Sequence, residues 1–211
     1  MIDDKPKEYK TQKVDFCGET FYIDERAYIP TIETEQLVNL VKEEANNPSS
    51  IVDVGTGSGC IAVTLAKEFP SAKIYAVDID EKALKVTRKN VKIHKTANII
   101  CSSGNYVDNL DIFSPNIIVA NLPWGDERYV LKSNSPEKLK FEPKIAIFHP
   151  KGILGAYEEL IASIVAKKWK TKLYFETGEM PKIEIQKIIP KNLKWEYYRM
   201  QNYSVSKVVF T

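Results

Sequence analysis

The sequence predicts an α/β protein built on a mostly parallel sheet, because strand-like and helix-like segments alternate from residue 50 onward. Short apolar runs of strand length occur at residues 51–54, 73–78, 98–101, 116–120 and 172–176. Two final segments, residues 194–200 and 206–210, predict a closing antiparallel pair. We therefore expect a seven-stranded, mostly parallel sheet with a C-terminal antiparallel hairpin.

Helices are predicted between these strands. Their expected ranges are residues 60–69, 81–91, 153–168 and 180–188, and Asp80 is a suitable N-cap for the second of them. An earlier helix carries Leu37, Leu40 and Val41 on one face, with Thr31 or Thr34 as its cap. Residues 126–141 show no periodicity, and a polar segment of this length is typical of a lid or binding loop.

The first 47 residues form an N-terminal extension to this pattern, and residues 48–211 form the main domain. Residues 14–16 and 20–23 flank Cys17-Gly18-Glu19 and predict a small β-hairpin with half-exposed aromatic side chains. Residues 1–12 are polar and aperiodic, so we expect a loosely attached tail there.

The composition indicates a folded soluble protein, since 44% of the residues are hydrophobic and 27% are charged. No apolar run approaches the roughly 20 residues of a membrane helix. The N-terminus lacks the pattern of a signal peptide, so we expect a cytoplasmic location and no membrane partner. The net charge of +2 gives only weak support for nucleic-acid binding.

Cysteine and histidine are too sparse to predict a metal site. The three cysteines, Cys17, Cys60 and Cys101, are widely spaced and resemble small buried hydrophobic residues. With only two histidines in the chain we expect no metal. Packing in the core or at the surface is the expected role of four further residues: His94, His149, Trp169 and Trp195.

A glycine turn after the first strand predicts a nucleoside site. Gly55, Gly57 and Gly59 let the backbone approach a ligand closely and present it to a helix N-terminus. Cys60 stands where the dinucleotide-binding pattern requires a further glycine, and no Gly-Lys-Ser or Gly-Lys-Thr follows. Neither a dinucleotide site nor a P-loop is therefore predicted.

Two acidic residues accompany this turn. Asp78 ends the second strand about 20 residues later, where a carboxylate can accept hydrogen bonds from both ribose hydroxyls. Asp53 lies next to the turn, where it either meets an ammonium group or holds the loop. The alternative for each is a role at the strand end unrelated to a ligand.

The fourth strand runs directly into a second candidate site. Its apolar residues are followed by Asn121, Leu122, Pro123, Trp124 and Gly125, so an amide and a flat ring are presented together at the strand end. The alternative is an ordinary loop that contains Asn and Pro.

Several segments together resemble a known family. VDVGTGSGCIA at residues 52–62 and AVDI at 76–79 are similar to the cofactor site of class I S-adenosylmethionine-dependent methyltransferases. FYIDER at 21–26, ETE at 33–35 and FEPKIAIF at 141–148 narrow the resemblance to HemK/PrmC protein-glutamine methyltransferases, which modify peptide-chain release factors. The similarity runs from about residue 13 to the C-terminus, so we expect the family's helical N-terminal domain to be missing.

The resemblance implies a Rossmann-like methyltransferase fold, S-adenosyl-L-methionine as cofactor, and a release factor as substrate. The implied cofactor-binding residues are Asp53, Gly55, Thr56, Gly57, Ser58, Gly59, Asp78, Ile79, Asn105, Tyr106 and Asn121. The implied catalytic and substrate-binding residues are Asn121, Leu122, Pro123 and Trp124, which align with the family's Asn-Pro-Pro-Tyr. In this alignment the Asn121 side-chain oxygen and the Leu122 carbonyl accept the two N–H groups of a substrate amide.

The chain departs from the family pattern at several of these positions. Leu122 replaces a proline, Trp124 replaces a tyrosine, and Asn105 stands where the family tends to have an aspartate. Thr31-Ile32 stands where Arg-Pro is usual.

Two alternatives to the leading hypothesis of glutamine methylation stay open. The first is methylation of an exocyclic amine of an RNA base, because the same strand end can hold any planar amine. The near-neutral charge counts against it. The second is a cofactor-binding protein without catalytic activity, which the presence of Asp53, Asp78 and Asn121 disfavours.

Overall fold

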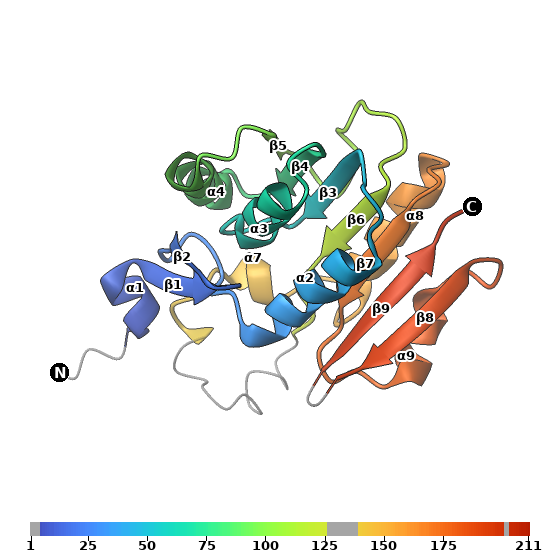
Figure 1. The fold of residues 1–211 in the computed structure, drawn as a ribbon. Coiled ribbons are helices and arrows are strands. Elements are labelled where there is room, and N and C mark those ends of the chain that lie inside the picture. The colour runs from blue at the N-terminus through green and yellow to red at the C-terminus, as the bar shows by residue number, and fades with distance from the viewer. Residues whose placement is uncertain (1–4, 126–138, 201–202) are drawn as a thin grey trace.

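The computed structural model describes residues 5–125, 139–200 and 203–211. Its centre is a seven-stranded sheet in the order β5-β4-β3-β6-β7-β9-β8 (Figure 1). The strands are β3 (Ser50–Val54), β4 (Lys73–Asp78), β5 (Ile99–Ser103), β6 (Ile117–Ala120), β7 (Lys172–Glu176), β8 (Lys194–Arg199) and β9 (Ser204–Val209). The first five are parallel, and β9 is antiparallel to both of its neighbours. The predicted mostly parallel sheet with a closing hairpin is confirmed.

Helices cover both faces of the sheet. They are α2 (Ile32–Glu44), α3 (Cys60–Glu68), α4 (Glu81–His94), α8 (Gly155–Ala166) and α9 (Lys182–Ile188). The short helix α7 (Lys144–Ile147) precedes α8. Alternate strand residues face opposite layers: Ile51 and Ile74 pack with α2 and α3, whereas Val52 and Val77 pack with α8. In the described part of the chain, no helix is long and apolar enough to cross a membrane.

The N-terminal extension is more firmly packed than the sequence suggests. β1 (Lys13–Phe16) and β2 (Glu19–Tyr22) form the predicted hairpin. The expectation of half-exposed rings was wrong for Phe16 and Phe21, which are each only 1% exposed, whereas Tyr22 is partly buried as expected. The expectation of a loosely attached tail was also wrong for the described residues, since α1 (Lys7–Thr11) precedes the hairpin. Buried Tyr9 fixes this helix by donating to the Ala27 carbonyl oxygen over 2.9 Å.

Other differences from the predicted elements are local. α4 continues to His94, three residues beyond its predicted end, and the short helix α7 was not predicted. Asp80 caps α4 as expected by accepting from the Lys82 N–H over 2.8 Å. Of the three cysteines only Cys60 is fully buried. Most of the predicted binding loop, residues 126–138, lies outside the described residues.

Strand register aligns the carboxyl ends of four neighbouring strands. Val54 pairs with Val77 on β4 and with Ala120 on β6, and Ala120 pairs with Phe175 on β7. The next residue of each strand therefore falls in one row along the sheet edge: Asp78, Gly55, Asn121 and Glu176. Strand order reverses between β3 and β6, and ligand sites of open α/β sheets form at such a switch point.

Candidate active site

A cavity of about 1250 Å³ opens at this edge of the sheet, and all four residues of the row line it. Most of the residues predicted for the site line it too: Gly55, Gly57, Asp78, Ile79, Asn105, Tyr106, Asn121, Leu122, Pro123 and Trp124. Four predicted cofactor-site residues do not reach the cavity: Asp53, Thr56, Ser58 and Gly59. The glycine turn and the end of β6, which are far apart in sequence, thus share one site.

The glycine turn depends on backbone shapes that other residues rarely adopt. Gly57 has φ +57° and donates its N–H to the Asp78 carboxylate over 2.8 Å. Gly59 has φ +81°, and a Cβ atom there would lie 2.7 Å from Thr87 Cγ2 and 3.2 Å from its Cα. Gly59 therefore allows the turn to pass close to α4, although it does not face the cavity.

Asp53 holds the turn from behind. Its side chain is fully buried, and its Oδ2 accepts from Thr56 Oγ1 over 2.6 Å and from the Ala62 N–H over 3.1 Å. Burial raises the pKa of Asp53 to about 7, against the effect of these hydrogen bonds. Of the two roles considered for Asp53, the observed contacts are those of holding the loop.

Asp78 is presented to the cavity with a fixed orientation. Its carboxylate accepts from the Gly57 N–H and, over 2.9 Å, from the Asp80 N–H. Burial raises its pKa, and each oxygen keeps lone pairs for a ligand. The next residue, Ile79, lines the same cavity and is 57% exposed. A carboxylate beside an exposed apolar side chain suits a nucleoside, which has ribose hydroxyls and an aromatic base.

The side chain of Asn121 is held from one end. Its Nδ2 donates to Thr34 Oγ1 over 2.8 Å, and this hydroxyl donates to Glu176 Oε2 over 3.1 Å. Thr34 and Glu176 are each 3% exposed. Burial raises the pKa of Glu176 to about 7. Neither residue was predicted for the site.

Leu122 has a main-chain N–H, which a proline lacks, and this donor has a hydrogen-bond partner in the fold. Its N–H donates to the hydroxyl of Tyr157, a fully buried residue of α8, over 3.0 Å. The Tyr157 hydroxyl can in turn donate its proton to the main-chain carbonyl oxygen of Leu122 or of Glu176. The Leu122 side chain packs over the glycine turn, where a Cβ atom on Gly55 would lie 2.7 Å from Leu122 Cδ2.

Trp124 closes another side of the cavity. Its ring packs on Gly178, since a Cβ atom at position 178 would lie 2.8 Å from Trp124 Cη2. The following Gly125 N–H donates to the Ile147 carbonyl oxygen over 2.8 Å. This bond brings the end of α7 to the cavity, so the segment at residues 143–148 belongs to its wall.

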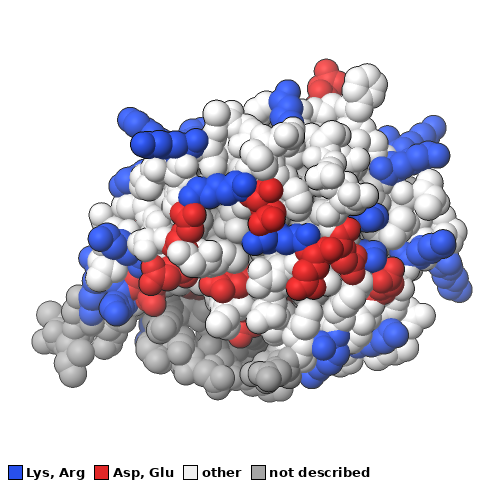
Figure 2. Space-filling model, in the orientation of Figure 1, with Lys and Arg blue, Asp and Glu red and all other residues white. Residues whose placement is uncertain are grey.

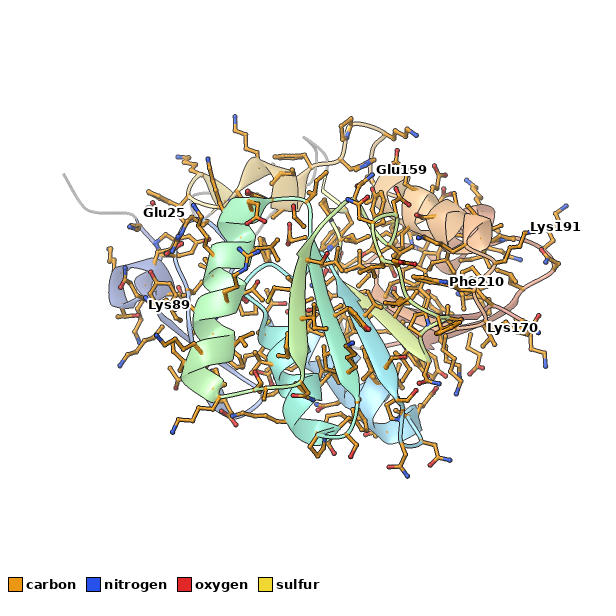
Figure 3. The ribbon with its side chains drawn as sticks, turned by 90° about the horizontal axis from the view of Figure 1, so that it is seen from above. Glu25, Lys89, Glu159, Lys170, Lys191 and Phe210 are labelled. Atoms are coloured by element: carbon orange, nitrogen blue, oxygen red, sulfur yellow. The ribbon has the colours of Figure 1, made fainter. Side chains whose placement is uncertain are left out.

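Several residues that line the cavity were not predicted for the site. His149 and Glu159 line the cavity beside the predicted Tyr106, so His149 is not confined to the packing role expected for it. Tyr106 Oη donates to Glu159 Oε2 over 3.0 Å, and Lys151 Nζ lies 2.7 Å from Glu159 Oε1; Glu159 projects from α8 (Figure 3). Glu176 carried a usable signal, because it is a polar residue at a strand end, like Asn121.

The chain is similar to known methyltransferases. Residues 32–134 match the model of the methyltransferase small domain family. The chain is 31% identical over 192 residues to a release factor glutamine methyltransferase of Enterococcus faecalis, covering 90% of this chain and 68% of the relative. A Flavobacterium psychrophilum protein of the same name is 30% identical, and the match covers 100% of this chain and 74% of that protein.

A solved structure shares the fold at low identity. The Thermus thermophilus 16S rRNA N2 methyltransferase RsmC, in complex with AdoMet and guanosine, superposes with a TM-score of 0.68 at 14% identity. The match covers 94% of this chain and 50% of that one. S-adenosylmethionine is the cofactor of the family to which these observations point. The chain belongs to the release factor glutamine methyltransferase family and is an S-adenosylmethionine-dependent N-methyltransferase.

Proposed function

We propose that this protein methylates the side-chain amide nitrogen of a glutamine in another protein, and that the substrate is a peptide-chain release factor. The observation that carries the proposal is the row at the sheet edge. It brings Asn121 and Leu122 into the same cavity as Gly57 and Asp78. The names of the relatives support the choice of substrate.

The cofactor fits the residues of this cavity. Asp78 would accept from the ribose hydroxyls, the backbone at Gly55 and Gly57 would pass beside the amino-acid part, and Ile79 would cover the adenine. Asn105 would accept from the adenine amino group through its side-chain oxygen. The bound cofactor supplies a methyl group on a positively charged sulfur, which is already activated for transfer.

The strand end would position the amide. An amide nitrogen is a poor nucleophile because its lone pair is delocalised into the carbonyl group. In our proposal the Asn121 Oδ1 and the Leu122 carbonyl oxygen accept the two N–H groups and direct the nitrogen toward the methyl carbon. Alignment of this kind can lower a barrier by about 7 to 11 kcal/mol. The nitrogen would take the methyl group, the bonding electron pair would stay with the departing cofactor, and one N–H proton would leave to water.

The charge of the cavity favours a protein substrate over RNA. Six acidic side chains line it: Glu33, Asp78, Asp80, Glu159, Glu176 and Glu179. The two basic residues among the described lining, Arg26 and Lys151, are already paired with Asp24 and Glu159. On the described part of the face in Figure 2, basic side chains are interspersed with acidic ones and form no continuous track. RNA phosphates would therefore find little positive charge at such an entrance.

Label partition tests the proposal. The protein is incubated with methyl-labelled S-adenosylmethionine and either a purified release factor or total RNA, with Asn121→Ala as the control. We expect label in the release factor with the wild type and, after the same time, about a hundredfold less or lower with Asn121→Ala. Label in RNA alone would refute the proposal and favour the base-methylating alternative.

A further inference from the structure

The amide of Asn121 is asymmetric in its surroundings. Its Nδ2 has a hydrogen-bond partner in Thr34, whereas no described residue donates to its Oδ1. An amide can be turned over at little cost when neither end is held, and only one orientation presents an acceptor to a substrate N–H. The hydrogen-bond partner of Nδ2 therefore determines which end of the Asn121 amide faces the cavity.

The direction of hydrogen bonding through Thr34 is fixed by chemistry. Nδ2 can only donate, so the Thr34 hydroxyl must accept there and use its single proton elsewhere. That proton goes to Glu176 Oε2, which lies 3.1 Å away. If Asn121 were turned over while Glu176 is ionised, its Oδ1 would compete with Glu176 for that one proton, and an Nδ2 group would face the substrate.

The three residues come together only in the fold. Asn121 and Glu176 end neighbouring parallel strands and are adjacent by register, and Thr34 bridges them from the first turn of α2. A carboxylic acid that is 3% exposed costs free energy to bury, and Thr34 is its one described side-chain partner. The cost of burying the Glu176 carboxyl group favours a role for it in orienting Thr34 and Asn121.

We propose that Thr34 and Glu176 are positioning residues, which fix the Asn121 amide with its oxygen toward the substrate nitrogen. The inference rests on the proposed function for its consequence in catalysis, but the orientation itself is a property of the free protein. Through Thr34, helix α2 of the N-terminal extension would thus help to position the substrate amide.

The test compares two substitutions of Thr34. Thr34→Val keeps the shape and removes the hydroxyl, whereas Thr34→Ser keeps the hydroxyl. We expect Thr34→Val to lower kcat about tenfold or more, the effect of one lost hydrogen bond in the transition state, and Thr34→Ser to stay within about threefold of the wild type. Cofactor affinity should be unchanged in both. Thr171→Val is the matched control, because Thr171 is also 3% exposed and lies just before the start of β7.

A second measurement does not depend on turnover. In the free wild-type protein, nuclear magnetic resonance should show the Asn121 Nδ2 protons protected from solvent exchange, and Thr34→Val or Thr34→Ala should remove that protection. Unprotected Nδ2 protons in the wild type, or equal kcat in Thr34→Val and Thr34→Ser, would overturn the inference. If no glutamine is methylated but the protection behaves as expected, the proposed function fails and the orientation stands.

Discussion

The hydroxyl of Tyr157 accepts a hydrogen bond from the main-chain N–H of Leu122 over 3.0 Å. Leu122 stands where the family pattern has a proline, which carries no N–H. The substitution therefore adds a buried donor at the strand end, and Tyr157 satisfies it from α8. The main chain at the divergent residue Leu122 is therefore held in place by a hydrogen bond.

Tyr157→Phe should lower the free energy of unfolding by about 1 to 3 kcal/mol, because the Leu122 N–H loses its acceptor in a buried place. Urea denaturation measures this difference. Tyr203→Phe is the matched control, since the buried Tyr203 hydroxyl has no partner among the described residues and its loss should be nearly neutral. Equal effects of the two substitutions would contradict the role of Tyr157.

Asn121→Ala should reduce turnover by about 10² to 10³, the range seen when one preorganised polar contact to a reacting group is removed. Cofactor affinity should stay close to that of the wild type, because Asp78 and the glycine turn are unchanged. Steady-state kinetics and calorimetry separate the two quantities. Turnover that survives the substitution would show that Asn121 does not hold the amide.

Asp78→Ala should weaken cofactor binding by about 1.5 to 3 kcal/mol, the value of a hydrogen bond to a charged group. The Gly57 N–H also loses its acceptor, so the turn is expected to loosen. Titration calorimetry measures the affinity, with Asp15→Ala in the N-terminal hairpin as the control. An unchanged dissociation constant would place the ribose elsewhere.

Gly55→Ala should impair turnover beyond its effect on stability. Gly55 has φ +71°, and its new Cβ would press on Leu122 Cδ2 at 2.7 Å. Gly18→Ala is the matched control, since Gly18 has φ +76° with nothing within 4 Å. Both should lose about 1 to 2 kcal/mol from backbone strain, but only Gly55→Ala should displace Leu122. Similar kcat values for the two variants would argue against the contact.

The stability of the free protein should fall as pH rises toward 7, in part because of Glu176. Burial, aided by Glu33 and opposed by the Thr34 hydrogen bond, raises the pKa of Glu176 from 4.5 to about 7. The folded state thus keeps a proton that the unfolded state releases. This stabilisation is complete below about pH 4.5 and is lost as pH rises through about 7.

Glu176→Gln should flatten this decline by up to about 1.4 kcal/mol per pH unit across that window. Denaturation at a series of pH values measures the slope. Glu43→Gln, at an exposed position of α2, should leave the slope as it is. A Glu176→Gln protein with the slope of the wild type would mean that the carboxyl group does not hold its proton.

The sheet and its flanking helices were predictable because their signals are local. Buried strands such as residues 51–54 and 117–120 are continuous apolar runs, and the turn at Gly55 marks the change from strand to helix. The short helix α1 was not predictable in this way. A long-range hydrogen bond from Tyr9 to Ala27 helps to hold it, and it has too few residues to show a period.

Asp78 and the strand end at Asn121 were predictable from the sequence, whereas the residues that hold Asn121 were not. Asp78 follows the glycine turn at a recognisable spacing, whereas Thr34 and Glu176 are 142 positions apart and meet only through strand register. Thr34 was considered as a helix cap, but Thr31 occupies the N-cap position. The Thr34 hydroxyl is thereby left for Glu176 and Asn121.

The most direct test of the account is to locate the transferred methyl group. After incubation of a release factor with the protein and S-adenosylmethionine, tandem mass spectrometry of the digested release factor should place one methyl group on a glutamine side-chain nitrogen. After the same time with Asn121→Ala, the methylated peptide should be about a hundredfold less abundant or scarcer. A methyl group on a different residue type, or an unmodified release factor beside methylated RNA, would contradict the central claim.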